Sequence, residues 1–515
     1  MYRLLVTLLL AVLLVGCTGD TEGSIKTTTN EESTLNVAYM AQPPSLDPHI
    51  TVAVATSEIG RTTFESLLSF NEKNEVAPLL AESFESSEDE KSITFHLRKG
   101  VKFHNGKEMT ADDVVASMER WRSLNGKAKT YFSNSEFVKE DDYTVILKMD
   151  KPLTIAKYIL AMNLNFAAIM PKEVIGSAEA AGVKEYIGTG PFQFVEWKQD
   201  QYIKFEKNED YQSPSTEMDG LVGKREPLVN DLTFHLVPDV STRTAGVQTG
   251  EYDIVLNIPT DNYEQLSKDP NLEVVLYPDG FTTAVFNNRE GLFVDKKRRQ
   301  AVNLAVKKED VLLTAYTREE FYTLEHGLVG KDYVAWHNDT GKDVYDSYDP
   351  KAAKELLKET GYNGEIVRII TTRDYDDQYN TAIVVQQQLE EIGMKVELLV
   401  YDWPTLLDIR EDETTYDIMI MNYNPVTDPT QINFLDSRTN YTGWTNDPKM
   451  DSLIDELLVA KNDAAAKEVF TQLQAEFWDY LPAIKFGDYS GVAVTHGSVT
   501  GFEHLHGAVL WNVSK

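Results

Sequence analysis

The amino-acid sequence predicts an α/β protein with a parallel sheet, on three observations. Between residues 365 and 423, three segments of strand composition alternate with two segments of helical periodicity. A strand–helix–strand–helix–strand order is typical of a parallel sheet with right-handed crossovers. Strand patterns also precede this region, from Asp231 to Asn287, and follow it, at Gly491–Thr495. The strands are expected at Glu365–Thr372, Lys395–Asp402 and Tyr416–Tyr423, and the helices at Asp377–Ile392 and Pro404–Glu411.

The chain is also expected to form two lobes joined by a hinge. The first domain opens with the alternating strand pattern Thr34–Met40, followed by a short helix over Gly60–Leu68. The chain is expected to leave this domain near Thr282–Phe286 and to re-enter it near Phe486. Two antiparallel crossings make a hinge, and closure about such a hinge buries a ligand between lobes.

Length and charge limit what the protein can bind. At 515 residues the chain is long enough for two or three domains with cores of their own. Lys plus Arg number 49 and Asp plus Glu number 82, so the formal charge is 49 − 82 = −33. Such a surface repels polyanions, and no nucleic-acid partner is expected. The basic run Lys296–Arg299 is interpreted as the solvated face of a helix over Lys296–Val311.

The first 33 residues are expected to direct export and anchoring. Arg3 is followed by an apolar run, Leu4–Val15, which has the length of a secretory signal and is too short to span a bilayer. The sequence from Leu14 to Cys17 resembles a bacterial lipobox, in which the cysteine is lipidated and becomes the first mature residue. Residues 1–16 are thus a predicted signal peptide. Residues 17–33 are a predicted flexible tether, which places the protein on the extracytoplasmic face of the cell membrane.

The folded part of the chain holds few of the groups that catalysis requires. Cys17 is the only cysteine, which excludes disulfides, cysteine nucleophiles and cysteine-ligated zinc. The chain has no P-loop, no dinucleotide fingerprint and no GxSxG motif. Its nine histidines are scattered, and the pair His504 and His506 has no identifiable third metal ligand nearby. We therefore expect no enzymatic activity, no cofactor and no metal site.

The most specific segment of the sequence is Ser92–Trp121. Apolar and polar residues alternate from Ile93 to Leu97, which predicts a strand with one buried face. Thr110 is expected to cap a following amphipathic helix, with Asp113 three residues on as its capping-box partner. Strand, tight connection and helix occur in many folds, but the particular string is far more restrictive.

This string resembles the signature TFxLRxGVKFHxGxxxTAxDVxxSxxR of the family 5 extracellular solute-binding proteins, the peptide- and nickel-binding subunits of ABC importers. Other segments are similar to the same family in the same order, so the resemblance covers nearly all of the chain after the tether. The signature is matched by Thr94, Phe95, Leu97, Arg98, Gly100–His104, Gly106, Thr110–Val114, Ser117 and Arg120, and the other segments are Ser45–His49, Phe64–Leu68, Val76–Phe84, Gly188–Phe192, Phe286–Ala301 and Tyr441–Trp444.

The resemblance implies the type II periplasmic-binding-protein fold, with two lobes, a hinge and an inserted third domain. Domain I would be discontinuous and comprise residues 34–67, 186–283 and 487–515. The inserted domain would cover residues 68–185, and the second lobe residues 284–486.

The resemblance also implies a function. The protein is expected to be a monomeric receptor that captures oligopeptides or dipeptides between its lobes and delivers them to the permease and ATPase of an ABC importer. Two alternatives stay open. One is a receptor for nickel or a metal–chelator complex, and the other is a surface lipoprotein that serves peptide-pheromone sensing or adhesion.

Candidate ligand-binding residues lie at the predicted strand ends. In open α/β sheets, ligands bind beyond the carboxyl ends of the strands. Aromatic faces beside carboxylates and amides suit a polar organic ligand. The candidates at these ends are Tyr401, Trp403, Asn422, Tyr423 and Asp428. Of these, Trp403 is equally compatible with packing in the core.

Asp428 has a specific predicted role. Peptide binders of this family usually place an acidic side chain against the ammonium group of the ligand, and Asp428 is the only carboxylate in the loop 422–428. We therefore predict that it pairs with a cationic group of the ligand. The resemblance adds three candidates: His49 after SLDP, Trp121 in the signature and Asn287 just after the expected domain crossing.

Overall fold

The computed structural model describes residues 33–515. The predicted signal peptide, the lipidation site Cys17 and all but the last residue of the predicted tether lie outside the described residues. Within residues 33–515, no helix has both the length and the apolar character that crossing a membrane requires. The predictions about export and anchoring therefore stay predictions.

One large sheet runs through both halves of the molecule. Its path is β15-β14-β16-β12-β17-β11-β1-β10-β9-β8, and β13 pairs with β17 beside this path. The strands are β1 (Thr34–Tyr39), β8 (Phe192–Lys198), β9 (Tyr202–Lys207), β10 (Asp231–Leu236), β11 (Ile254–Val255), β12 (Leu272–Phe286), β13 (Tyr322–Thr323), β14 (Ile366–Thr372), β15 (Lys395–Tyr401), β16 (Ile418–Tyr423) and β17 (Ala483–His496).

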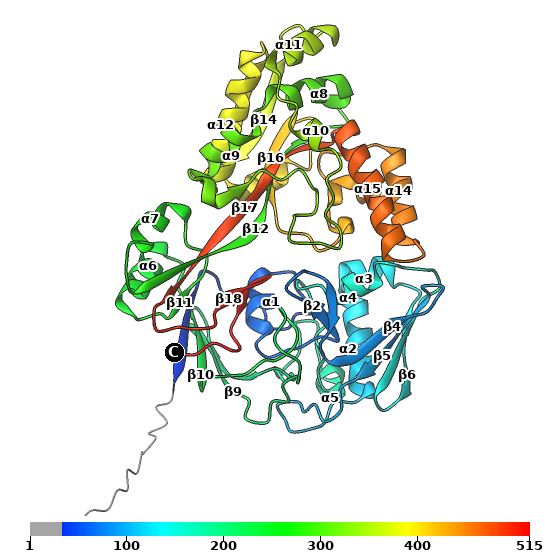
Figure 1. The fold of residues 1–515 in the computed structure, drawn as a ribbon, viewed down its shortest axis with the longest axis vertical. Helices are drawn as coiled ribbons and strands as arrows, with labels where there is room; N and C mark the ends of the chain where they lie inside the picture. The colour runs from blue at the N-terminus through cyan, green and yellow to red at the C-terminus, as the bar shows by residue number, and fades with distance from the viewer. Residues whose placement is uncertain (1–32) are drawn as a thin grey trace, which may run out of the picture.

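The upper half of Figure 1 contains the predicted parallel unit. Strands β14 and β15 pair in parallel, and so do β14 and β16, which confirms the strand order expected from residues 365–423. The two crossover helices are α12 (Asp376–Glu391) and α13 (Trp403–Ile409). The other helices of this half are α8 (Lys296–Ala305), α9 (Lys308–Tyr316), α10 (Lys342–Tyr345), α11 (Pro350–Glu359), α14 (Pro448–Leu458) and α15 (Asp463–Tyr480).

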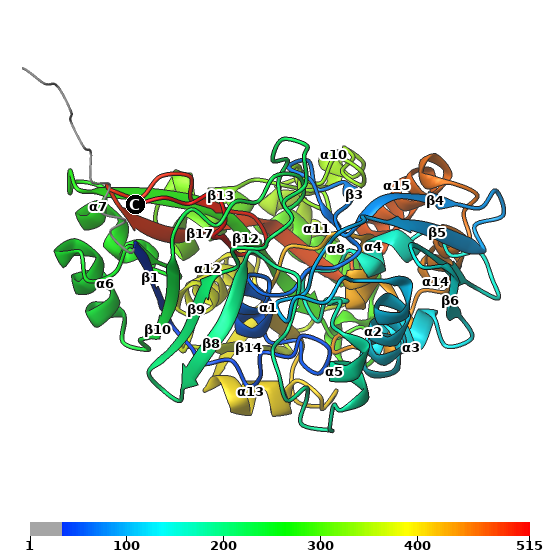
Figure 2. The same cartoon turned by 90° about the horizontal axis from the view of Figure 1, so that it is seen from below.

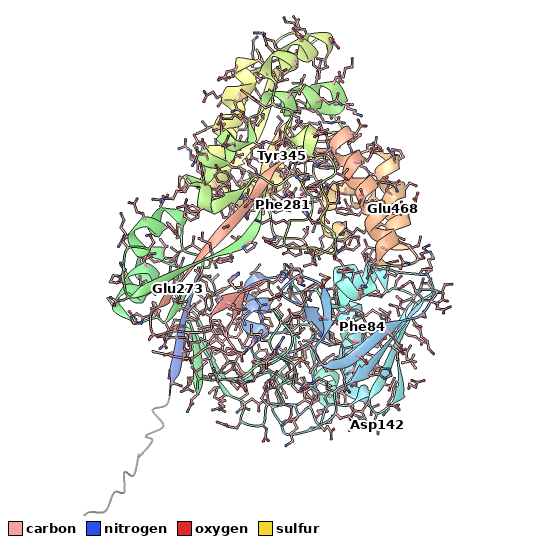
Figure 3. All side chains as sticks on the ribbon, viewed as in Figure 1. Phe84, Asp142, Glu273, Phe281, Tyr345 and Glu468 are labelled. Carbon is pink, nitrogen blue, oxygen red and sulfur yellow. The ribbon has the colours of Figure 1, made fainter. Side chains whose placement is uncertain are left out.

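The two predicted crossings are the long strands β12 and β17. They pair antiparallel from Leu272 opposite His496 to Val285 opposite Ala483, with register shifts near Gly280 and Thr282. Figure 3 shows Glu273 near the lower end of β12 and Phe281 near the upper lobe. Within the region of strand patterns expected from Asp231 to Asn287, residues 272–286 form the single long strand β12, whose pairing with β17 shifts register at the turn-like residues near Gly280.

The lower half of Figure 1 holds two further units. One is built on β1, β8, β9, β10 and β11. The other, seen at the opposite side of the molecule from α6 and α7 in Figures 1 and 2, has its own sheet in the order β4-β5-β7-β6. Elements of the lower half are α1 (Val54–Gly60), α2 (Ala111–Leu124), α3 (Gly126–Tyr131), α4 (Ala156–Leu160), α5 (Lys172–Gly176), α6 (Val240–Thr249), α7 (Tyr263–Leu266), β2 (Leu68–Phe70), β3 (Val76–Pro78), β4 (Ala81–Ser86), β5 (Ser92–Leu97), β6 (Glu136–Asp141), β7 (Thr144–Lys148), β18 (Glu503–His504) and β19 (Ala508–Val509).

The signature segment folds as predicted. Strand β5 buries Ile93, Phe95 and Leu97, and α2 begins after Thr110 with a complete capping box between Thr110 and Asp113. This segment therefore provides the core of the second lower unit.

Two helix predictions were wrong in their bounds. The helix expected over Gly60–Leu68 lies instead at α1, which ends at Gly60, and Leu68 already belongs to β2. Two β-branched threonines directly follow the C-cap Arg61, and β-branched side chains disfavour the helical conformation. The helix expected over Lys296–Val311 is two helices, α8 and α9, because Val306 and Lys307 adopt extended backbone angles.

Candidate ligand-binding site

The predicted strand-end residues lie around the carboxyl ends of β15 and β16. The ring of Trp403 contacts that of Tyr375 edge-on, with centroids 5.0 Å apart, and both rings are partly exposed to solvent. The ring of Tyr423 stacks on Phe281 of β12, with centroids 5.3 Å apart. Asn422 donates a hydrogen bond from its amide to the carboxylate of Asp377 at the start of α12. The strand ends thus contact both the hinge and the first turn of α12.

Asp428 is fully buried, and its carboxylate oxygens accept hydrogen bonds from residues of its own loop. Its Oδ1 accepts hydrogen bonds from the backbone N–H of Thr430, at 2.9 Å, and from the Thr430 hydroxyl. Its Oδ2 accepts from the side-chain amide of Gln431 at 2.8 Å. These bonds make Asp428 the cap of the short 3-10 turn Pro429–Gln431, and its pairing with a ligand cation stays a prediction.

The three candidates that rest only on the resemblance are also buried and hydrogen-bonded. His49 Nε2 lies 2.9 Å from the carbonyl oxygen of Ala168. The Trp121 indole donates to the carbonyl of Asn165, and its side chain is 0% exposed. Asn287 donates to the carbonyl oxygens of Glu413 and Tyr416. Each contact has a structural purpose, and a part in ligand binding stays a prediction for all three.

Two carboxylates that the sequence analysis did not single out lie near the hinge, within electrostatic reach of each other. Asp279 lies on β12 at the first register shift, and Asp377 lies in the first turn of α12. Burial and the neighbouring charge of Asp377 raise the pKa of Asp279 to about 6. Burial also raises the pKa of Asp377, although hydrogen bonds from Asn422 and Tyr316 oppose this. No Lys or Arg of the described chain forms an ion pair with either carboxylate.

Two stacked tyrosine rings lie beside Asp377. Tyr316 of α9 stacks on Tyr489 of β17 with centroids 5.2 Å apart, and its hydroxyl lies 3.3 Å from Asp377 Oδ2 and 2.5 Å from the Thr282 hydroxyl. A Cβ added at Gly280 would lie 2.1 Å from the backbone carbonyl oxygen of Tyr423 and 2.7 Å from the Tyr489 hydroxyl, so the close approach of β16 to β12 requires glycine there. The pKa values of Tyr316 and Tyr489 are raised well above the ordinary value, chiefly by burial.

A second polar group lies on the domain I side, at the end of β1. The Tyr39 hydroxyl donates to Glu58 Oε2 at 2.5 Å. The imidazole of His504 stacks on Tyr277 with centroids 3.5 Å apart, and its Nε2 lies 3.9 Å from Glu58 Oε1. Burial, with Asp279 as a secondary cause, raises the pKa of Glu58, so this group and the carboxylate pair lie within electrostatic reach of each other.

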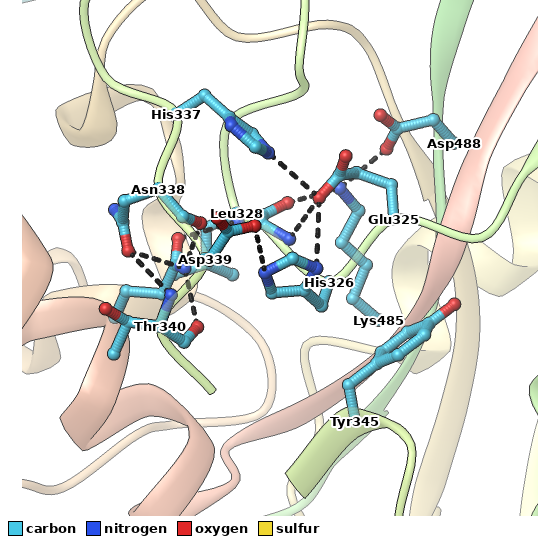
Figure 4. Close-up of polar contacts among 12 residues, drawn as sticks. Glu325, His326, Leu328, His337, Asn338, Asp339, Thr340, Tyr345, Lys485 and Asp488 are labelled. Carbon is cyan, nitrogen blue, oxygen red and sulfur yellow. Dashed lines mark hydrogen bonds and ion pairs between the residues drawn. The ribbon is translucent and has the colours of Figure 1, made fainter. Parts of the chain in front are cut away.

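On the upper-lobe side of β17, by contrast with Asp279, the charged residues have partners of opposite charge or hydrogen-bond partners (Figure 4). Lys485, 1% exposed, lies 2.6 Å from Asp488 Oδ1 and donates to the carbonyl oxygen of Gly327 at 2.5 Å. Glu325 accepts hydrogen bonds from the backbone N–H of Gly327 at 2.6 Å and lies 3.3 Å from His337 Nε2. These contacts fix the segment 325–340 against β17. Within residues 33–515, no group of three or more His, Cys, Asp or Glu has the geometry to hold a metal ion.

The two-lobed α/β fold, with polar and aromatic side chains beside the hinge, agrees with the family that the sequence matches. The family model of the bacterial extracellular solute-binding proteins, family 5, matches residues 75–446. The chain belongs to this family. The two-lobe fold predicted from the sequence is therefore confirmed.

Individual relatives of this family 5 solute-binding protein cover most of its length. A probable peptide ABC transporter periplasmic-binding protein of Sinorhizobium fredii is 27% identical over 485 residues, which are 91% of each chain. The oligopeptide-binding protein AppA of Bacillus subtilis is 28% identical over 88% of this chain and 86% of its own. The crystal structure of the ABC transporter substrate binding protein CtaP of Listeria monocytogenes has the same fold, with a TM-score of 0.81 at 22% identity over 91% and 95% of the two chains.

The sequence offers weak signals for the hinge-side residues of this family 5 protein. Pro278-Asp279-Gly280 has the composition of a turn, which predicts that Asp279 lies in a connector and not in a strand. Asp377 lies in the acidic run Asp374–Asp377, which is typical of a helix N-terminus and needs no ligand to explain it. Asp377 contacts Asn422 at the end of β16, and β16 pairs with β12, the strand that holds Asp279.

Proposed function

We propose that this protein is the substrate-binding receptor of an ABC importer and that it captures oligopeptides or dipeptides between its two lobes. The names of its relatives from Sinorhizobium fredii and Bacillus subtilis, which specify peptide or oligopeptide binding, support this substrate class. The bound ligand is delivered to a membrane permease and its ATPase, and the receptor acts as a monomer that binds without chemical conversion.

One structural observation carries the proposal. Asp279 lies at the first of the register shifts between the crossing strands β12 and β17, and Asp377 lies in the first turn of α12 in the upper half of the molecule. Tyr489 lies on the second crossing strand beside them, and its stacked partner Tyr316 lies on α9. A ligand in contact with these groups touches both lobes and the hinge, so its binding favours the closed arrangement.

The same groups argue against one alternative. A metal–chelator complex with net negative charge requires cations such as arginine around it. The hinge side offers carboxylates and tyrosine hydroxyls instead, and neither Asp279 nor Asp377 has a Lys or Arg partner in the described chain. A peptide with a free amino terminus has the charge that complements this site.

The anchoring part of the proposal rests on the sequence alone. Cys17 follows an apolar segment in a lipobox-like context, so the mature protein is anchored by lipid to the extracytoplasmic face of the cell membrane. This location puts the receptor beside the permease that it serves.

Calorimetric titration with a small library of di- to nonapeptides tests the proposal. We expect at least one peptide class to bind with one-to-one stoichiometry and to raise the melting temperature as ligand concentration increases. Absence of binding by every peptide, with binding of nickel–histidine complexes instead, would reject the peptide assignment.

A further inference from the structure

A small cavity lies in the lower half of the molecule, where four segments that are distant in the sequence meet. Its volume is about 30 Å³, which is room for roughly two waters or one ion of similar size. Among the described residues that line it, none belongs to β12 or β17, so the cavity is distinct from the groups beside the hinge. The lining side chains with polar atoms include Ser57, Arg61, Glu65, Asn163, Arg225 and Trp511.

Four nitrogen donors of these lining residues have no partner among residues 33–515. The Nε atoms of Arg61 and Arg225 are buried without a hydrogen-bond partner, and so are the indole Nε1 of Trp511 and the amide Nδ2 of Asn163. Arg225 is 3% exposed and Trp511 is 1% exposed, so bulk solvent does not provide the acceptor. Buried donors without an acceptor are costly, and four of them around one cavity indicate an acceptor inside it.

Arg61 brings a positive charge to the cavity wall. Within the described chain its guanidinium donates to carbonyl oxygens and not to a carboxylate: Nη1 to Leu505 at 3.1 Å, and Nη2 to His506. Burial lowers the pKa of Arg61 to about 10, and the charge of Arg225 acts in the same direction, although Glu58 opposes both. The side chain of Arg61 is therefore still a cation at neutral pH, and a second arginine lies within electrostatic reach of it.

The carboxylate of Glu65 also lines the cavity, but its oxygens already have donors. Its Oε1 lies 3.2 Å from Arg225 Nη1 and accepts a hydrogen bond from the Tyr211 hydroxyl at 2.8 Å. Its Oε2 accepts from the Thr189 hydroxyl at 2.8 Å. Glu65 thus balances the charge of Arg225, and the charge of Arg61 has no equivalent partner at the cavity.

We propose that this cavity binds one small monovalent anion, chloride, with Arg61, Arg225 and Trp511 among its donors. Chloride accepts several hydrogen bonds and supplies the missing negative charge, whereas water supplies no charge and must itself donate where the lining offers mainly donors. A peptide is too large for this volume, so the site is separate from ligand capture. The ion bridges α1, the connector at Arg225 and the C-terminal segment, and it should stabilise the folded state.

Thermal unfolding in different salts tests the site in solution. The comparison is between sodium chloride and sodium gluconate at equal ionic strength, because gluconate is too large for a cavity of about 30 Å³. An ion that binds only the folded state raises the melting temperature as its concentration increases. We expect this rise with chloride and with bromide, and none with gluconate. Equal melting temperatures in all three salts would overturn the site.

Trp511→Phe removes one donor and keeps an aromatic ring against Arg225, whose guanidinium lies 4.2 Å from the ring centroid of Trp511. The chloride concentration that gives half of the rise should increase by at least about tenfold, because a hydrogen bond to a charged group contributes that much affinity. Trp336→Phe is the control, since Trp336 also has a buried indole N–H without a described partner but lies in another core. Parent-like chloride dependence in Trp511→Phe would overturn the site.

Asn163→Asp supplies the negative charge from the chain itself. The change keeps the shape of the side chain and places a carboxylate at the cavity wall, so the melting temperature should no longer respond to chloride. Asn105→Asp adds the same charge at an exposed position and should keep the response of the parent. A full chloride response in Asn163→Asp would contradict the proposal.

Anomalous diffraction from crystals soaked in sodium bromide locates the ion directly. We expect a bromine peak within hydrogen-bond distance of the Nε atoms of Arg61 and Arg225, and no such peak in Asn163→Asp. Density for water in the cavity of the parent, without a bromine peak, would overturn the anion assignment.

Discussion

At the scale of single residues, the surroundings of Asp279 disfavour the ionised form of its carboxyl group. Asp377 of α12, Glu58 of α1 and the hydroxyls of Tyr277 and Tyr489 lie within electrostatic reach of this carboxylate, and none of them is a cation. Keeping Asp279 ionised at neutral pH therefore costs the unliganded protein free energy. A group that recognises a cation has this property, because the ligand removes the cost.

The pH dependence of stability follows from this raised pKa. Asp279 has a pKa of about 6 in the folded protein, against an ordinary value of 3.8, so the folded state binds more protons between these limits. Stability is therefore lost as the pH rises from about 4 to about 6, and the loss persists above. Asp279→Asn should raise the free energy of unfolding at pH 7.5 by up to about 3 kcal/mol, with no gain near pH 4. Denaturant titrations of both proteins at the two pH values measure this, and an equal gain at both would contradict it.

Asp428 should behave in the opposite way. Its two oxygens accept hydrogen bonds from Thr430 and Gln431 in a fully buried loop, so Asp428→Asn places a donor where acceptors are needed. We expect a loss of stability of about 1–3 kcal/mol, measured by thermal and denaturant unfolding of the unliganded protein. Asp408→Asn, an exposed change on α13, is the control and should be neutral. A stable Asp428→Asn that has lost peptide binding would instead restore Asp428 as the partner of the ligand.

At the scale of elements, β12 and β17 form the hinge and border the proposed site. Their pairing is interrupted near Gly280 and Thr282, and the opposing residues Gly487 and Tyr489 lie at the same level. The paired charges of Lys485 and Asp488 stabilise β17 on the upper side of this interruption. The upper lobe therefore holds a fixed strand, while the irregular pairing provides the position at which the two lobes can rotate.

Lys485→Met tests this fixed strand. The change removes the counterion of Asp488 and the donor to Gly327 from a site that is 1% exposed, so we expect a loss of stability of about 3 kcal/mol. Lys331→Met, exposed on the neighbouring segment, should have no measurable effect. If both variants unfold at the same denaturant concentration as the parent, the Lys485 contacts do not stabilise the hinge.

Most elements were predictable because their signals are local. The capping box of Thr110 and Asp113, and the alternation of strand and helix from residue 365 to 423, need only neighbouring residues. The candidate site was less predictable, because Asp279 and Asp377 are 377 − 279 = 98 positions apart and lie on different elements, β12 and α12. The rule that ligands bind beyond strand ends led to Asn422, which contacts Asp377, whereas Trp121 was proposed from a signature segment and packs in a helix core.

At the scale of the whole molecule, the proposed anchor and the folded receptor are expected to have separate roles. The sequence predicts an export and anchoring segment over residues 1–33 and folded domains after it. The anchor is therefore expected to determine where the receptor is located, and the fold to determine what it binds.

Cys17→Ser tests the anchor. The variant should be released from membranes into the soluble fraction and should keep the melting temperature of the parent, as shown by cell fractionation and thermal unfolding. A variant that stays firmly bound to membranes would contradict lipid anchoring at Cys17.

The central claim is that ligand capture closes two lobes about β12 and β17. Small-angle X-ray scattering of the parent protein, with and without a saturating concentration of its tightest-binding peptide, tests this claim most directly. The account predicts a smaller radius of gyration with the peptide, and a smaller change in Asp279→Asn at the same peptide concentration. An identical radius of gyration with and without a peptide that calorimetry shows to be bound would contradict closure.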